Sequence, residues 1–379
     1  MNPLLSIVVP TKNRYKYLKH LITLIESFNS SEIELLIQDN SDDNSEFLEY
    51  LENIKFSCVK YLYEQKKLSQ AGNSDLAIYN STGEYVCFIG DDDGVTKHIV
   101  DCVKWMKMNQ IDALSSSLAF YMWPDCISHI DPTSSLTYKP FNGSFEITDA
   151  QIELKKVMEN GCVNMGKLPS VYQGIVKRTV LEKIYSIGNT YHPGPSPDMA
   201  CAVALSFFVE KYVRVDFPII ITGASVHHGG GIDKLKNRIA NIEDVPFLPQ
   251  NAKENWEKNI PSVWTSATVW PESAIKSLRY LNKGELIKKI NFEYMLAKFL
   301  VFHFEIKEKA IKLSSNKMKL YFYVLKILFS RYFNAGIRIL SRKLNLRLLD
   351  SKKMILNLNT IEDANDYLCT QYPNFKINN

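Results

Sequence analysis

The run YVCFIGDDDGV, residues 85–95, joins a strand-length apolar segment to three consecutive carboxylates and a glycine. Asp91, Asp92 and Asp93 repel one another, and like charges this close cost stability unless a positive group lies between them. No basic residue follows them before Lys97. The run is therefore either a solvated turn whose aspartates accept backbone N–H bonds, or a site that holds a cation.

The chain leading up to this run alternates between two kinds of hydrophobic pattern. Short β-rich apolar runs predict strands, and apolar residues spaced three and four apart predict helices. Strands that alternate with helices favour a parallel sheet covered by helices on both faces. The predicted strands are 4–11, 33–43, 58–65 and 84–90, and the predicted helices are 15–28, 45–54 and 71–82.

Three of the predicted strands end in polar residues. The pairs Pro10-Thr11 and Asp39-Asn40 end the first and second strands, and residues 91–93 end the fourth. The carboxyl ends of parallel strands meet at one edge of a sheet, where ligands bind in folds of this kind. We therefore expect these residues to form one site, and a hard divalent cation such as Mg²⁺ or Mn²⁺ suits its carboxylates.

Composition limits the classes of protein that the chain can represent. Its 379 residues, 46% of them hydrophobic, are those of an ordinary globular protein long enough for two domains. The seven cysteines include no C-x-x-C pair, which suits a reducing compartment. No run of about 18 apolar residues and no secretory signal are found, so the sequence predicts a cytoplasmic protein.

Charge divides the chain unequally. Residues 1–270 carry 25 Lys and Arg against 32 Asp and Glu, whereas residues 271–355 carry 19 against 6. Residues 325–349 combine basic residues with apolar ones at helical spacing. This pattern predicts either an amphipathic helix packed on the rest of the protein or an interfacial helix on the anionic inner leaflet of a membrane. Nucleic acid is not an expected partner, because recognition motifs are missing and the first 270 residues are acidic.

Four motifs in order resemble the family 2 glycosyltransferases of the GT-A fold. They are SIVVPTKNR (6–14), LLIQDNSDD (35–43), NSTGEYVCFIGDDD (80–93) and PSPD (195–198). The resemblance covers residues 4–230. It implies an α/β fold with a Rossmann-like nucleotide-sugar-binding domain and a mostly parallel central sheet, to which the sequence adds a helical C-terminal extension.

The resemblance also implies which residues bind the nucleotide-sugar. The first motif would lie against the nucleotide, and Asp39 would accept a hydrogen bond from the base. Arg14 also has a plainer interpretation as a surface charge, and Asp39 as a turn or helix-capping residue. Asn73 occupies a family position where an Arg-Asn pair is common, but Gly72 precedes it here. The residues expected to bind the nucleotide-sugar are Pro10, Thr11, Asn13, Arg14, Asp39, Asn73, Asp91 and Asp92.

The same resemblance implies a Mn²⁺ or Mg²⁺ cofactor held by Asp93 and Asp91. A histidine beyond the catalytic base often completes such sites, and here SVHHGGG (225–231) offers two. His228, directly before the glycines, is the expected ligand and His227 the alternate.

Asp198 is the expected general base. Transfer with inversion, which the resemblance implies, requires a carboxylate that removes the acceptor's hydroxyl proton. Prolines 193, 195 and 197 restrict the backbone before it, and a helix is predicted to follow. The plainer interpretation is a first-turn aspartate that stabilises a helix, and many family members have Glu-Asp where this chain has Pro197-Asp198.

These inferences predict a metal-assisted, inverting glycosyltransferase that moves a sugar from a nucleotide-diphosphate donor, a UDP-sugar, to a hydroxyl of a glycan or lipid-linked acceptor. The expected divisions are a catalytic domain over 1–230, with halves 1–110 and 111–230, a connector over 231–270 and a basic helical region over 271–379. Two alternatives stay open, a sugar nucleotidylyltransferase and a non-catalytic membrane-associated scaffold. The aromatic and amide residues Tyr172, Gln173, Trp123 and Trp264 are candidates for an acceptor pocket or for core packing.

Overall fold

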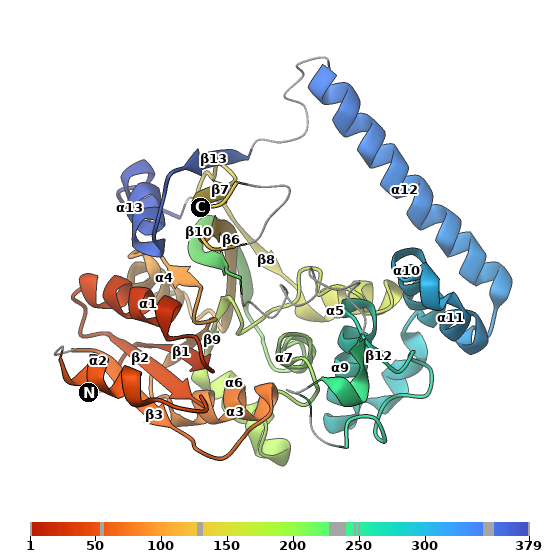
Figure 1. Ribbon diagram of the computed structural model, residues 1–379, viewed down its shortest axis with the longest axis horizontal. Helices are drawn as coiled ribbons and strands as arrows, with labels where there is room; N and C mark the ends of the chain where they lie inside the picture. The colour runs from red at the N-terminus through yellow and green to blue at the C-terminus, as the bar shows by residue number, and fades with distance from the viewer. Residues whose placement is uncertain are drawn as a thin grey trace.

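The structure is a computed structural model, shown in Figure 1. It describes residues 2–53, 57–126, 132–226, 240–245, 248, 251–343 and 352–377.

The first part of the chain alternates strands and helices as the sequence predicts. The strands are β1 (Leu5–Thr11), β2 (Ile33–Asp39), β3 (Val59–Tyr63) and β4 (Tyr85–Phe88). Their order in the sheet is β3-β2-β1-β4, and every pairing among them is parallel. The carboxyl ends of these strands therefore meet at one edge. The helices between them are α1 (Tyr15–Ser27), α2 (Ser45–Glu52) and α3 (Gln70–Asn80).

The second part extends the same sheet with mixed directions. Strand β9 (Gly174–Lys177) lies antiparallel between β4 and β6 (Ala113–Met122), and β10 (Tyr212–Ala224) runs parallel to β6. Shorter strands complete this part: β5 (Gly94–Val95), β7 (Ser135–Tyr138) and β8 (Phe145–Thr148). Its helices are α4 (Ile99–Met108), α5 (Ala150–Glu159), α6 (Arg178–Gly188) and α7 (Pro197–Leu205).

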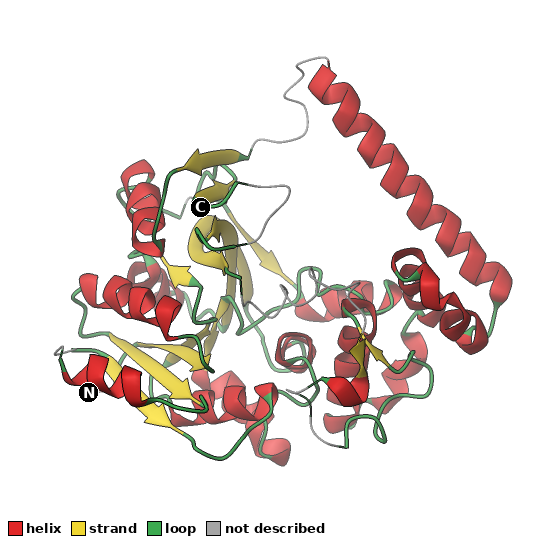
Figure 2. Cartoon of the chain, viewed as in Figure 1, coloured by secondary structure: helices red, strands yellow, loops and turns green. Residues whose placement is uncertain are grey.

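Helices cover both faces of the sheet (Figure 2), because side chains alternate along each strand. In β1, Leu5, Ile7 and Val9 join a core with α1, α4 and α13 (Ile361–Gln371). Val8 points to the opposite core, where it meets α3, α6 and α7. This arrangement agrees with the predicted α/β fold.

The C-terminal region is mostly helical and forms a core of its own together with α5 and α7. Its helices are α9 (Ser266–Tyr280), α10 (Phe292–Phe302), α11 (Lys307–Leu313) and α12 (Lys317–Lys343). Helix α9 begins within the range that the sequence marks as a connector. The region also holds the two-residue strands β11 (Ala240–Asn241) and β12 (Val263–Trp264) and the 3-10 turns η1 (Ile242–Asp244), η2 (Gly284–Lys289) and η3 (Phe304–Ile306).

The end of the chain returns to the first part of the molecule. Strand β13 (Lys353–Leu356) pairs antiparallel with β7, and α13 lies beside α1, as Figure 1 shows. Ile361, Ala364 and Leu368 of α13 are buried in the same core as β1. The C-terminal region therefore contacts the sheet-forming part of the chain in two places, through the core shared with α5 and α7 and through β13 and α13. Among the described residues, no helix has the length and apolarity needed to cross a membrane.

Candidate active site

The polar residues at the strand ends lie together, as the sequence predicts. Thr11 and Asp39 are register partners at the ends of β1 and β2. The Thr11 hydroxyl donates a hydrogen bond of 2.7 Å to Asp91 Oδ2, which joins the end of β1 to the carboxylates that follow β4. All three carboxylates, Asp91, Asp92 and Asp93, are buried.

Arg14 supplies the positive charge that the local sequence lacks. Its guanidinium lies 3.1 Å from Asp91 Oδ1 and 2.8 Å from Asp92 Oδ2. It also donates to the hydroxyl of Ser225, which in turn donates to Asp92 at 2.6 Å. The protein itself therefore compensates part of the charge of the triplet. Arg14 is distant in sequence but close in space, because β1 and β4 are neighbours in the sheet.

Asp93 is held by a different set of groups. Its carboxylate accepts hydrogen bonds from the backbone N–H groups of Gly90 and Gly223, at 2.9 and 2.8 Å. Gln173 Nε2 donates to it at 3.0 Å, and the Tyr172 hydroxyl lies 3.4 Å away. Tyr172 and Gln173, considered from sequence as acceptor-pocket residues, thus position this carboxylate. Trp123 is buried, and its indole N–H donates to the Asp92 carbonyl.

Burial decides the electrostatics of this cluster. Burial raises the pKa of Asp91. The positive charge of Arg14 opposes this increase, and the negative charge of Asp92 adds to it. Burial also raises the pKa of Asp93, and the charge of Asp92 adds to that effect. One guanidinium balances only one of the three carboxylates when all are ionised. In that fully ionised state the cluster would carry a net charge of −2.

The donor set suits a divalent cation. Asp91 Oδ1 is buried and forms an ion pair with Arg14 at 3.1 Å but accepts no hydrogen bond. Carboxylate oxygens are the ligands that Mg²⁺ and Mn²⁺ prefer. Among the residues that the structure describes, no three His, Cys, Asp or Glu side chains gather as a complete metal cluster. Mg²⁺ commonly takes one or two carboxylates from a protein and its other ligands from substrate phosphates and water. The predicted ligand His228 and its alternate His227 lie outside the described residues.

Asp39 is buried, and its acceptor capacity is already used. Its Oδ2 accepts from the hydroxyls of Tyr15 and Tyr61, and its Oδ1 accepts from the N–H and hydroxyl of Ser41. An ionised carboxylate has about four lone-pair sites, and four donors occupy them here. The predicted contact with the nucleotide base stays a prediction, and it requires one of these donors to move.

The remaining residues that were predicted to bind the nucleotide lie at the same edge of the sheet. Pro10 is the second-last residue of β1. Asn13 adopts a positive φ of 58°, and its backbone N–H donates to the Ser41 hydroxyl. The Asn73 side-chain amide lies 3.4 Å from the carbonyls of Thr11 and Gln38, while its buried Oδ1 has no partner. These residues connect the turns after β1 and β2 to the start of α3.

Asp198 lies in the first turn of α7, with Pro197 as the first helical residue. It is half-buried, and burial raises its pKa to about 6. Burial also raises the pKa of Tyr172 well above its ordinary value, and the charges of Asp93 and Asp198 raise it further. The charges of both carboxylates therefore act on this phenol.

The loop before α7 is anchored by residues that the sequence did not single out. Asp75 of α3 accepts hydrogen bonds from Thr190 Oγ1 and from the N–H groups of Tyr191 and His192. From the other side, Ser273 of α9 accepts from the Ser196 N–H. Asp75 resembles any polar residue of a half-exposed helix, so no local signal distinguishes it.

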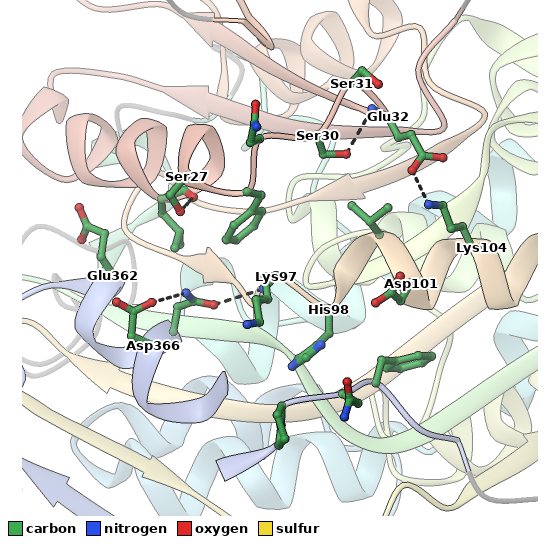
Figure 3. A pocket seen from close by; sticks show the side chains of 18 of the residues that line it. Ser27, Ser30, Ser31, Glu32, Lys97, His98, Asp101, Lys104, Glu362 and Asp366 are labelled. Atoms are coloured by element: carbon green, nitrogen blue, oxygen red, sulfur yellow. Dashed lines mark hydrogen bonds and ion pairs between the residues drawn. The ribbon is translucent and has the colours of Figure 1, made fainter. Parts of the chain in front are cut away.

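Two cavities border this half of the protein. One, of about 660 Å³, adjoins the strand edge and includes two predicted residues; it is lined by Asn13, Arg14, Tyr15, Lys16, Tyr17, Lys19, His20, Glu46, Asp125 and Val226. The other, of about 950 Å³, lies between α1, α4 and the C-terminal segment (Figure 3). Its lining includes the Lys104–Glu32 ion pair, and none of the predicted site residues lines it.

Comparisons with known proteins find similarity to the first part of the chain. Residues 6–138 match the family model described as glycosyl transferase family 2. A Campylobacter jejuni protein named GalNAc(5)-diNAcBac-PP-undecaprenol beta-1,3-glucosyltransferase is 25% identical over 182 residues, which are 48% of this chain and 53% of that protein. Glycosyltransferase GlyG of Streptococcus pneumoniae is 28% identical over 114 residues, 30% of this chain and 38% of that protein. The matches thus span about half, or less, of the relatives' length.

Among solved structures, S. aureus TarS 1-349 in complex with UDP-GlcNAc has a TM-score of 0.49 and 15% identity, and the match covers 84% of this chain and 78% of that chain. So low a similarity carries no argument, and the fold class rests on the sheet and on the family model. Residues 6–138 thus match the glycosyl transferase family 2 model, which confirms the resemblance seen in the first three motifs. Both curated relatives are named as glycosyltransferases.

Proposed function

We propose that this protein is an inverting glycosyltransferase that moves a sugar from a nucleotide-diphosphate donor, a UDP-sugar, to a hydroxyl of a lipid-linked glycan. The observation that carries the proposal is the placement of Asp198, whose pKa is raised to about 6, within electrostatic range of the Tyr172 phenol that also contacts Asp93. A carboxylate with a pKa near 6 is mostly ionised at neutral pH and is still basic enough to accept a proton.

In this proposal each side chain has a defined task. Asp198 accepts the proton of the acceptor hydroxyl as its oxygen attacks the anomeric carbon, and the bond from that carbon to the diphosphate oxygen breaks on the opposite face. Asp91 and Asp93 would hold Mn²⁺ or Mg²⁺, which would balance the charge of the leaving diphosphate. Arg14, beside Asp91 and Asp92, provides a second positive charge at the same edge.

One relative supports the proposed class of acceptor. The Campylobacter jejuni protein is named for transfer to an undecaprenol-linked oligosaccharide. We propose a lipid-linked acceptor of the same kind, used in the synthesis of a surface polysaccharide. We further propose that the protein works at the inner face of the cytoplasmic membrane, where such an acceptor would be presented.

The proposal is tested with Asp198→Asn, which keeps the size of the side chain and removes its basicity. We expect donor affinity, measured by calorimetry with Mn²⁺, to stay within twofold of the wild type, and kcat to fall by about 10² to 10⁴. In the wild type, kcat at saturating donor should fall as the pH drops below about 6, because protonation removes the base.

Asp75→Asn is the matched control, because it makes the same chemical change in a carboxylate that only anchors the loop. It should retain a much larger share of kcat than Asp198→Asn. Near wild-type turnover of Asp198→Asn would exclude the base assignment. Donor binding without turnover by the wild type on lipid-linked acceptors would instead favour a non-catalytic scaffold.

A further inference from the structure

Helix α12 has one face that packs against the protein. Leu320 and Ile327 are buried in the C-terminal core. The ring of Tyr323 lies 5.4 Å from that of Tyr294 in α10, and its hydroxyl accepts a hydrogen bond from Asn291. These contacts cover one apolar face of the amphipathic helix that the sequence predicts.

The opposite face of α12 carries a second set of large apolar side chains. At 100° per residue these positions fall within about 120° of the helix circumference, centred opposite Ile327. Their exposed fractions range from 47% for Tyr321 to 83% for Met318. We call this set the apolar stripe; it consists of Met318, Tyr321, Phe322, Leu325, Phe329, Tyr332 and Phe333.

The stripe is continuous and unpartnered among the described residues. Phe329 and Phe333 stack on one another, with centroids 5.8 Å apart, and not on another element. In Figure 1, α12 extends well beyond α10 and α11. An exposed apolar surface of this extent is unusual in a protein that meets only water, and it marks an interaction site.

Charge identifies the occupant. Helix α12 contains seven Lys and Arg residues and no Asp or Glu. Lys319 and Lys326 border the stripe on one side by helical position. Two copies of this helix, if paired through their stripes, would bring like charges together, which opposes self-association. An anionic lipid surface offers both an apolar layer and negative charge.

We propose that α12 docks in the plane of an anionic bilayer through the apolar stripe, while its opposite face packs against α10 and the C-terminal core. The phenylalanine, leucine and methionine side chains enter the boundary between headgroups and acyl chains, and the tyrosines and lysines lie at headgroup level. This inference deepens the proposed function and rests on it only in that a lipid-linked acceptor gives such docking a purpose.

The test is flotation of the full-length protein with vesicles of phosphatidylethanolamine and phosphatidylglycerol. We expect Phe322→Glu/Phe329→Glu to lower the bound fraction at least tenfold. The matched control, Met108→Glu/Ile152→Glu, adds the same charge at exposed apolar positions outside α12 and should bind as the wild type does. Vesicles of phosphatidylcholine alone should bind the wild type more weakly, because they carry no net charge.

Three outcomes would overturn the proposal. In the first, the stripe variant floats with the vesicles as much as the wild type does. In the second, the stripe variant and the control lose the same share of the vesicle-bound fraction. The third is a dimer in ultracentrifugation without vesicles that the stripe variant abolishes, since this would assign the stripe to a second copy. Circular dichroism and thermal melting establish that the stripe variant is folded.

Failure of this inference is distinguishable from failure of the proposed function. On a water-soluble acceptor analogue, the stripe variant should keep wild-type kcat, because the stripe lies outside the strand-edge site. Lys319→Gln/Lys326→Gln should lower flotation with anionic vesicles and leave the binding to phosphatidylcholine vesicles unchanged. The electrostatic part of the proposal would be contradicted if the lysine variant bound anionic vesicles as the wild type does and if the wild type bound anionic and phosphatidylcholine vesicles equally.

Discussion

At the scale of single residues, the acidic run after β4 is stabilised by Arg14. A guanidinium between Asp91 and Asp92 offsets part of the repulsion and part of the burial cost that three adjacent carboxylates impose. The same guanidinium occupies the space beside Asp91 Oδ1, where a divalent cation would bind. A resident arginine and an incoming cation therefore compete for one carboxylate.

This competition predicts the effect of replacing Arg14 on metal binding without donor. Arg14→Gln removes the competing charge, so we expect Mn²⁺ to bind about tenfold more tightly, a gain of about 1.4 kcal/mol. Arg14→Lys retains a positive charge and serves as the matched control, with Mn²⁺ affinity close to that of the wild type. Calorimetry or the paramagnetic resonance signal of free Mn²⁺ measures both, and weaker binding by the glutamine variant would contradict the competition.

At the scale of elements, strand β10 completes the site that β4 begins. Its Gly223 donates to Asp93, and Ser225, which follows the strand, donates to Asp92. The backbone of β10 approaches so closely that a Cβ on Gly223 would lie 1.7 Å from the Asp92 carbonyl oxygen. The absence of a side chain at this position is therefore what allows β10 to reach the carboxylates.

We accordingly expect Gly223→Ala to separate β10 from the acidic run. The free energy of unfolding should fall by about 3 kcal/mol or more, since backbone must move to relieve the clash. Gly284→Ala is the control, because a Cβ there meets nothing within 4 Å, and it should change stability by less than about 0.5 kcal/mol. Chemical denaturation measures both variants, and equal stability would show that the close approach is absent in solution.

At the scale of the whole molecule, the two ends of the chain share a core. Helix α13 places Ile361 against Gly94 and Leu24, and Glu362 pairs with His20 of α1 at 3.0 Å. The basic helices thus lie between two segments that belong to the sheet.

This arrangement predicts that a change near the C-terminus weakens the N-terminal core. Ile361→Ala removes a fully buried side chain, so the free energy of unfolding should fall by about 2–5 kcal/mol. Ile147→Ala, at an exposed position of β8, is the matched control and should cost far less. Chemical denaturation measures the loss of stability, and hydrogen exchange measures the protection of the amide protons in β1 and β4. Unchanged protection of these strands would contradict a shared core.

Much of the first 90 residues follows from local sequence. The predicted strands and helices agree with the structure to within a few residues, because period and turn residues are local properties. That Thr11, Asp39 and Asp91 share an edge also follows, since parallel strands bring their carboxyl ends together. The helix start at Asp198 was readable from the prolines before it.

The tertiary structure decided how these residues are used. Arg14 is the counter-ion of the acidic run, and Asp39 accepts hydrogen bonds from two tyrosine hydroxyls. Asp75 anchors the loop before α7. Each depends on a partner far away in the chain, whose approach is fixed by strand order and not by local pattern. The periodicity of α12 was visible in the sequence, but only packing showed which apolar face is covered and which is left for another surface.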